Sequence, residues 1–293
     1  VAAAKETGFD PAQVTETPHG CVASEFQNLC NTVLEVLLQM PSLGPDRASR
    51  ERMVERGGLT IQTEIDGRTQ RAAQSAVSNY VHPTDPVIGL MVMIEPGTGL
   101  IKGMAQSRPN IGTNPGETFL NYAMEKEIGK AAGYFGGSTY KMFVLAAAIA
   151  KGYPTSRTYD APKQRDWKGE IFKNCDGPFR FNSPYDPRNA GGSGTFDMYS
   201  GTKHSVNNYF IALEQDVGIC DSIRMAETLG LKIQYKKGED INVLSNYPSF
   251  TLGAAESSPI SLANAYATLA ARGMRCDPIL LKSVVNKAGK EFE

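Results

Sequence analysis

The sequence lacks an apolar run long enough to cross a bilayer, and it lacks a metal-ligand pattern of cysteine and histidine. Its longest clean apolar stretch, residues 143–150, is far shorter than the roughly 20 residues that a transmembrane helix needs. None of the five cysteines stands in a Cys-x-x-Cys pair, and the three histidines form no ligand pattern with them. We therefore expect no membrane span in these residues and no metal site.

The sequence also has no excess of charge of either sign. With 30 basic and 31 acidic residues, its formal net charge is −1, so neither nucleic acid nor an anionic membrane is the expected main partner. We expect that the first residues are not a leader segment, because Lys5 and Glu6 follow the first four residues directly. A secreted origin would make this chain a processed piece of something longer.

What the sequence does have is the composition of a globular protein, 41% hydrophobic over 293 residues, enough for a sizeable core. Apolar spacing and Gly/Pro breaks predict helices at 24–40, 48–58, 67–81, 138–151, 197–217, 220–229 and 258–272. A half-buried strand is expected at 59–66, a β-hairpin around Pro96-Gly97-Thr98-Gly99, and a strand entering a hairpin turn at 287–290. Residues 107–135 are expected to form a surface loop. The Gly- and Pro-rich stretch 155–200 is expected to be a long loop, and a loop of that length is expected to be functional.

Two residues that open the most apolar predicted helix carry reactive groups. Ser138 and Lys141 stand three positions apart, which places the hydroxyl and the amine on one helical face. Gly136 and Gly137 permit a tight turn into the helix, whose free N–H groups would favour a developing oxyanion. Burial would lower the pKa of the Lys141 amine and make a neutral base available. The alternative is a helix-capping serine and a surface lysine.

A second short pattern follows the Gly-rich stretch. Ser205 and Asn207 are separated by one residue, 67 positions after Ser138, where a helical segment opens. A turn there could aim into one cleft a hydroxyl that relays a proton and an amide that holds a substrate carbonyl. A simple helix cap also fits this pattern by itself. The order and spacing of the two patterns favour catalysis.

Together the two patterns resemble the transpeptidase region of class A (bifunctional) penicillin-binding proteins of actinobacterial type, which carry Ser-x-x-Lys and Ser-x-Asn as two of three active-site motifs. Three further stretches agree in family order: GGLTIQTEIDGRTQRAAQSAV at 57–77, IEPGTGLIKGMAQSRPNIG at 94–112 and TLGAAESSPISLANAYATLAARG at 251–273. The resemblance covers nearly the whole chain. It implies the α/β (α+β) fold of penicillin-binding proteins and serine β-lactamases, with helices on both faces of a central antiparallel sheet.

The resemblance also implies roles for the four residues. Ser138 would be the acylated nucleophile and Lys141 the acceptor of its proton. Ser205 would pass the proton to the leaving amine, and Asn207 would position the substrate amide. The implied reaction is D,D-transpeptidation: attack on a D-Ala-D-Ala bond of a peptidoglycan stem peptide, release of D-Ala, and aminolysis by a second stem peptide. β-Lactams would be trapped at Ser138, and no cofactor is implied.

The sequence departs from the family pattern in two places. Thr63-Glu64-Ile65-Asp66 stands where the family's linker usually reads Thr-Thr-Leu-Asp, which affects packing and not chemistry. The third motif, Lys-Thr/Ser-Gly, is absent, since Lys287-Ala288-Gly289 lacks the hydroxyl. The resemblance thus implies an N-terminal helical or linker segment at 1–57 and a transpeptidase domain at 58–293 that is incomplete at its C-terminal end. The family's upstream glycosyltransferase domain and membrane anchor are not in this sequence.

The sheet of such a domain would carry an open, apolar edge, so we expect the missing strands and the third motif to arrive on a second chain. Spacing alone leaves the cysteines open between buried thiols of a cytosolic protein and disulfides. With the resemblance, we expect Cys21–Cys30 and Cys175–Cys220 to pair, and Cys276 to link to the second chain. The expected location is the extracytoplasmic face of the bacterial cell membrane, with this chain as an ectodomain fragment.

Other functions remain open at this point. Within the superfamily, the rival is a hydrolase, either a D,D-carboxypeptidase or a β-lactamase, and slow deacylation would exclude the lactamase. A rival of another class is a penicillin-recognising sensor or wall-binding module without turnover. An extracellular structural domain without an active serine is the third alternative, and it would leave two motifs in family order to chance.

Overall fold

The structure, a computed structural model, describes residues 20–293, so the first part of the predicted 1–57 segment lies outside the described residues. The helices, with η for 3-10 helices, are η2 (Gly20–Ala23), α2 (Gln27–Leu37), η3 (Pro41–Leu43), α3 (Arg47–Glu55), α4 (Gly67–Tyr80), α5 (Lys126–Gly129), η4 (Gly137–Tyr140), α6 (Lys141–Ala150), α7 (Met198–Lys203), α8 (Asn207–Val217), α9 (Ile219–Thr228), α10 (Ile241–Leu244), η5 (Phe250–Leu252) and α11 (Pro259–Ala270). The strands are β1 (Leu59–Thr63), β2 (Leu90–Ile94), β3 (Ile101–Gln106), β4 (Tyr134–Phe135), β5 (Tyr159–Ala161), β6 (Ile171–Lys173), β7 (Pro178–Arg180), β8 (Gly194–Phe196), β9 (Glu256–Ser257), β10 (Leu281–Asn286) and β11 (Glu291–Phe292).

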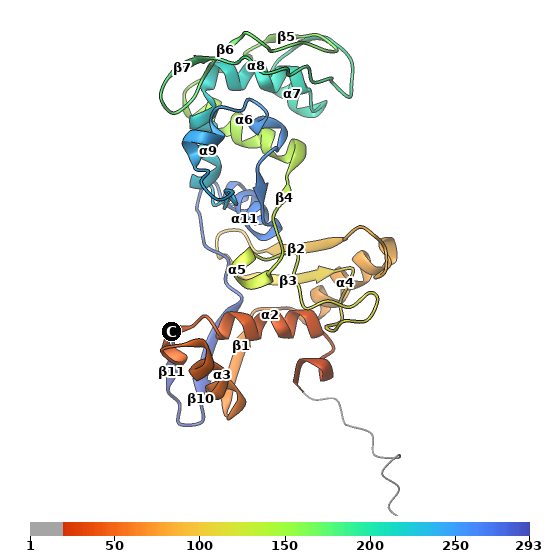
Figure 1. The fold of residues 1–293 in the computed structure, drawn as a ribbon, viewed down its shortest axis with the longest axis vertical. Helices are drawn as coiled ribbons and strands as arrows, with labels where there is room; N and C mark the ends of the chain where they lie inside the picture. The colour runs from red at the N-terminus through yellow and green to blue at the C-terminus, as the bar shows by residue number, and fades with distance from the viewer. Residues whose placement is uncertain (1–19) are drawn as a thin grey trace, which may run out of the picture.

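These elements form three groups along the long axis of the molecule (Figure 1). At one end, β1, β10 and β11 make an antiparallel sheet beside α2 and α3. The hairpin β2–β3 and α4 lie in the middle. At the other end, α6, α7, α8 and α9 lie together beneath the ribbons that contain β5, β6 and β7. The residues of both catalytic patterns belong to this helical end.

The side chains of the hairpin β2–β3 alternate between its two faces. Met91 and Met93 pack with Ala73 of α4 on one face. Val92 packs with Ile260 of α11 on the other. This arrangement follows from the period of two along a strand, and it confirms antiparallel strands with helices on both faces. The strands are distributed over one three-stranded sheet and several two-stranded ones in the described part of the chain.

The outer edge of β3 is closed by side chains of α4. The Gln70 amide donates to Met104 O at 2.6 Å and accepts from Met104 N at 2.8 Å, so it stands in for a neighbouring strand. Gln74 Nε2 donates to Gln106 O at 3.0 Å in the same way. On the opposite side, β2 has no second strand partner among residues 20–293. The expected open edge is therefore that of β2.

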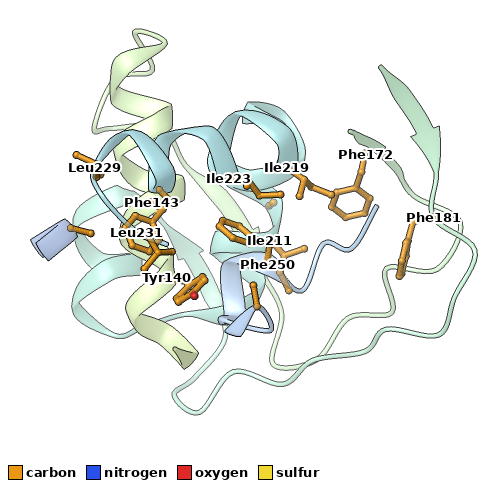
Figure 2. Packing of buried hydrophobic residues seen from close by; sticks show 14 of the residues in the cluster. Tyr140, Phe143, Phe172, Phe181, Ile211, Ile219, Ile223, Leu229, Leu231 and Phe250 are labelled. Atoms are coloured by element: carbon orange, nitrogen blue, oxygen red, sulfur yellow. The ribbon is translucent and has the colours of Figure 1, made fainter. Parts of the chain in front are cut away.

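The helical end is organised around α6 and the 3-10 turn η4 before it. Figure 2 shows Tyr140 and Phe143 packed among side chains of α8, α9 and η5, with Ile211 and Phe250 among them. The Tyr140 ring meets the Phe143 and Phe250 rings edge-on, each at a centroid distance of 5.3 Å. This core fixes η4, which carries Ser138, and the first residue of α6, Lys141, against η5.

Four sequence predictions need correction in detail. The helix predicted at 138–151 begins as the 3-10 turn η4, and the one predicted at 197–217 is broken between α7 and α8. The stretch 107–135 is not only surface, because Ser107, Asn121 and Ala123 are buried within it. The stretch 155–200 contains the ribbons β5–β8 and β6–β7. The predicted helices at α2, α3, α4, α9 and α11, the strand β1 and both hairpins are confirmed.

The N-terminal helices share cores with the rest of the chain. Leu29 and Val33 of α2 pack in the cluster that contains Ile101 and Leu280, and Leu37 packs with Val284. The division at residues 57 and 58 stays a prediction, because these contacts join its two sides.

The structure contains the two disulfides that we expected. Cys21–Cys30 joins η2 to α2, and Cys175–Cys220 joins the turn between β6 and β7 to α9. Cys276 is free and half-buried. No helix in residues 20–293 has the length and apolar character needed to span a bilayer.

Candidate active site

Ser138 lies on a tight turn that leads into α6. Gly137 has φ +58°, a conformation that favours glycine, and a Cβ on Gly136 would lie 2.1 Å from the Tyr140 ring. The turn is held from inside by Tyr140, whose hydroxyl donates to Ser257 Oγ at 2.8 Å. Ser138 itself is exposed. The two glycines therefore let the chain present the Ser138 hydroxyl to solvent from a buried support.

Lys141 is the first residue of α6, and its side chain is only 4% exposed. Its Nζ donates to Ser205 O at 2.6 Å, to Ser205 Oγ at 3.0 Å and to Asn207 Oδ1 at 2.6 Å. None of these acceptors is a carboxylate, so no negative charge offsets the loss of water around the amine. Burial accordingly lowers the pKa of Lys141 from 10.5 to about 8. A substantial fraction of the amine is neutral near pH 8.

Ser205 occupies the break between α7 and α8. It has φ +50°, which costs free energy for a residue with a side chain. Asn207 begins α8; its Nδ2 donates to Arg188 O at 2.7 Å while its Oδ1 accepts from Lys141. The strained turn thus brings a hydroxyl, a carbonyl and an amide oxygen onto one amine.

The structure brings Lys141, Ser205 and Asn207 together as the sequence pattern suggests. Ser138 stands less than one turn before Lys141 on the same segment. Within residues 20–293, the Ser138 hydroxyl makes no hydrogen bond to the other three side chains. In a free enzyme such contacts are often long and tighten when substrate binds.

Sequence reasoning missed a network that anchors the 155–200 stretch beside Asn207. Trp167 is fully buried, and its Nε1 donates to Asn208 Oδ1 at 2.9 Å. The Asn208 backbone N–H donates to Asn189 Oδ1 at 2.9 Å, and Asn208 Nδ2 donates to Pro187 O at 3.1 Å. These bonds fix the segment that carries Arg188, the partner of Asn207. The sequence feature that could have indicated this buried network is its one tryptophan, which stands in an otherwise polar stretch.

Sequence reasoning also missed Gly253. It follows η5 with φ +75°, and a Cβ there would lie 2.0 Å from Gly137 N and 2.4 Å from Gly137 O. Only a glycine lets the two backbones approach so closely. Gly253 therefore supports the turn that carries Ser138.

The described residues contain no group of three or more His, Cys, Asp or Glu side chains that could hold a metal ion. The chemical groups available at the site are a hydroxyl, a partly neutral amine, a second hydroxyl and an amide. Such a set suits nucleophilic acyl transfer, in which an amine takes the proton from an attacking hydroxyl.

Comparisons with known proteins agree with this chemistry. The family model for the penicillin binding protein transpeptidase domain matches residues 89–292. Penicillin-binding protein 1A of Mycolicibacterium smegmatis is 28% identical over 249 residues, which cover 82% of this chain and 28% of that protein. The protein of the same name from Mycobacterium tuberculosis is 27% identical over 82% of this chain and 27% of its own length. The chain thus spans under a third of these relatives.

Solved structures share the fold. The structure of PonA1 from Mycobacterium tuberculosis in complex with penicillin V superposes with a TM-score of 0.65 at 24% identity, over 90% of this chain and 64% of that one. The penicillin G acyl-enzyme complex of penicillin-binding protein A from the same organism gives a TM-score of 0.64 at 22% identity, over 86% and 63%. The antiparallel sheets and helices described above are those of this fold.

Proposed function

This chain belongs to the penicillin-binding protein transpeptidase family, and from that premise we propose that it is a serine-type peptidoglycan D,D-transpeptidase. The observation that carries the proposal is the buried Lys141 amine, held by Ser205 and Asn207 one turn from an exposed Ser138. Burying a lysine without a carboxylate costs free energy, and a general base with a lowered pKa requires such a setting.

In the proposed reaction, the neutral Lys141 amine takes the proton of Ser138 as its Oγ attacks the carbonyl of a D-Ala-D-Ala bond. The proton passes through Ser205 to the leaving amine, and D-Ala departs. The acyl group then remains on Ser138 as an ester. The amine of a second stem peptide attacks this ester, forms the cross-link and returns the proton to Ser138. Asn207 positions the substrate amide.

β-Lactams fit the same scheme because ring opening by Ser138 leaves no departing group. With a D-Ala-D-Ala substrate, D-Ala departs and a second stem peptide then attacks the ester. With a β-lactam, the broken amide stays attached to the acyl group, so the ester on Ser138 persists. The related structures include a penicillin V complex of PonA1 and acyl-enzyme complexes of penicillin-binding protein A with penicillin G, imipenem and ceftriaxone. We propose that this chain is acylated by β-lactams at Ser138.

The proposed reaction needs a third motif, which residues 1–293 do not contain. A Lys-Thr/Ser-Gly strand would supply the cation for the substrate carboxylate and border the oxyanion hole, and the unpaired side of β2 is where further strands can join. The strands would come from a continuation of the polypeptide or from a second chain, which Cys276 would link to this one by a disulfide. Peptidoglycan as substrate and two disulfides support an extracytoplasmic location.

The test is intact-protein mass spectrometry after incubation with benzylpenicillin, with Ser138→Ala as control. We expect one adduct on the parent chain and none on the variant. An adduct that survives in Ser138→Ala would overturn the assignment of the nucleophile. Release of the adduct within minutes would favour the hydrolase alternative. Stable acylation without any turnover of a D-Ala-D-Ala peptide and an amine acceptor would favour the sensor.

A further inference from the structure

One buried acid has no part in the mechanism above. Glu214, on the third turn of α8, is fully buried. Neither of its carboxyl oxygens has a hydrogen-bond partner among the described residues, and the same is true of Thr251 Oγ1. No other buried side-chain oxygen or nitrogen in residues 20–293 is left unpaired. Unpaired buried polar groups are rare in folded proteins and call for an explanation.

The surroundings of Glu214 keep it uncharged. Burial raises the pKa of Glu214 well above its usual value of 4.5, and no cation counteracts that effect. Tyr185, another acid, interacts electrostatically with Glu214, and the pKa of Tyr185 is raised mainly by its own burial. An ionised carboxylate in this position would lack both water and a counter-ion. Glu214 is therefore a carboxylic acid that can both donate and accept a hydrogen bond.

Thr251 is the group that faces it. Glu214 stands three residues after Ile211 on α8, so both side chains lie on one helical face. Ile211 packs with Phe250, the residue before Thr251, which places Glu214 on the side of α8 that meets η5. The direction in which the Thr251 backbone N–H acts on the pKa of Glu214 agrees with this placement. Thr251 is itself fully buried. A neutral Glu214 could accept from Thr251 N and donate to Thr251 Oγ1, and such a pair would satisfy the unpaired groups on both residues.

The segment that Glu214 faces is the one that supports Ser138. Phe250 packs edge-on against Tyr140, and Gly253 lies against the backbone of Gly137. In Figure 2, Phe250 of η5 lies beside Ile211 of α8 and close to Tyr140. A shift of η5 relative to α8 would therefore be passed to the turn that carries the nucleophile.

We propose that Glu214 is a positioning residue: its buried carboxyl group pairs with Thr251, whose buried hydroxyl has no other partner among the described residues, and this pairing holds η5 and Gly253 against the nucleophile turn. The expected effect of Glu214 on acylation rests on the proposed function of Ser138. The expected effect of Glu214 on the position of η5 is independent of that function, because this effect concerns only the link between α8 and η5.

Two variants separate hydrogen bonding from volume. Glu214→Gln keeps the shape and can donate and accept, whereas Glu214→Leu keeps a similar volume and can do neither. Ser222→Ala is the matched control, because Ser222 is also fully buried and hydrogen-bonded, but lies on α9 and donates to Gly218 O. Near-ultraviolet circular dichroism would verify that each variant is folded.

The first measurement is hydrogen exchange of peptides that cover residues 249–256. The amides of Leu252 and Gly253 donate to Ser249 O and Phe250 O in this segment, so their exchange reports the closure of η5. We expect at least about tenfold faster exchange in Glu214→Leu, and parent-like exchange in Glu214→Gln and Ser222→Ala. Unchanged exchange in a folded Glu214→Leu would overturn the proposal. Should that variant not fold, equally fast exchange in Glu214→Gln would overturn it.

The second measurement is acylation by benzylpenicillin, resolved into the binding constant and the acylation rate constant. We expect the acylation rate constant of Glu214→Leu to fall at least about tenfold with little change in binding, because a displaced nucleophile slows the chemical step. Glu214→Gln should restore it. A parent chain that is not acylated would count against the proposed function, and the exchange experiment would still decide the role of Glu214.

Discussion

Gly253→Ala is the substitution from which the geometry of the nucleophile turn predicts the largest effect. The new Cβ would lie 2.0 Å from Gly137 N, 2.4 Å from its O and 2.6 Å from its Cα. Carbon atoms in contact prefer separations of about 3.5–4.0 Å. The obstructing atoms belong to backbone and cannot rotate away, so the turn before Ser138 must move by about 1 Å or more.

Two separate costs follow. The φ of +75° at Gly253 costs an alanine about 1–2 kcal/mol, and the forced displacement adds about 1–3 kcal/mol. We expect the free energy of unfolding to fall by about 2–5 kcal/mol. A displacement of about 1 Å at a reacting group can slow a reaction about 100-fold, so acylation of Ser138 by benzylpenicillin should slow by about that factor.

Gly152→Ala is the matched control. Gly152 has φ +81° at the end of α6, and a Cβ there would meet no atom within 4 Å. It carries the conformational cost of about 1–2 kcal/mol without the displacement. Urea unfolding and the rate of adduct formation by mass spectrometry measure both variants. The reasoning is refuted if Gly253→Ala is no less stable than Gly152→Ala and is acylated at the parent rate.

Four further outcomes are expected. The acylation rate should rise with pH and level off above about pH 8, where Lys141 is neutral, whereas Lys141→Arg should be slow at every pH, because an arginine does not release its proton. The same shift makes the native state lose this proton earlier than the unfolded state does, so the contribution of Lys141 to the free energy of unfolding should increase between about pH 8 and pH 10.5; urea titrations at several pH values test this. Replacing both Cys175 and Cys220 by alanine should cost about 4 kcal/mol, and replacing both Cys21 and Cys30 about 3 kcal/mol, because the closed loops separate the cysteines by 45 and 9 positions; the two melting curves decide the order. Gln70→Ala should cost about 2–4 kcal/mol, since it leaves the N–H and C=O of Met104 unpaired at the edge of β3; urea unfolding beside the more exposed Gln74→Ala tests it.

The sequence predicts those parts of the structure that depend on local pattern. Alternating apolar residues locate β1, and two apolar runs around Pro96-Gly97-Thr98-Gly99 locate the hairpin β2–β3. The Gly57-Gly58 pair marks the end of α3. The meeting of Lys141 with Ser205 and Asn207 depends on family resemblance instead, because nothing in a spacing of 64 or 66 positions brings side chains together. The break at Ser205 is invisible to helical periodicity, since the apolar pattern continues on both sides of it.

The residues that sequence reasoning missed act through contacts between distant segments. A glycine in a turn is ordinary, and only the neighbour found in the fold shows that Gly253 must lack a side chain. Glu214 looks like a solvent-facing acid in a helix, because charged residues are seldom fully buried, and it becomes unusual only once its burial is known. Asn189 looks like an ordinary loop residue and Asn208 like an ordinary polar residue of the predicted helix, until the structure shows Trp167 bonded to Asn208 and Asn208 bonded to Asn189.

The stretch 250–266 supports the turn around Ser138 from three sides. Gly253 touches the backbone of Gly137, Ser257 accepts a hydrogen bond from Tyr140, and the Tyr266 hydroxyl donates to Thr139 O at 3.0 Å. These contacts hold the residues on both sides of an exposed serine while they leave its hydroxyl free for a substrate. A nucleophile fixed before the reaction needs little reorganisation in the transition state. Substitutions in this stretch should therefore slow acylation more than they weaken binding, although none of these side chains needs to touch the substrate.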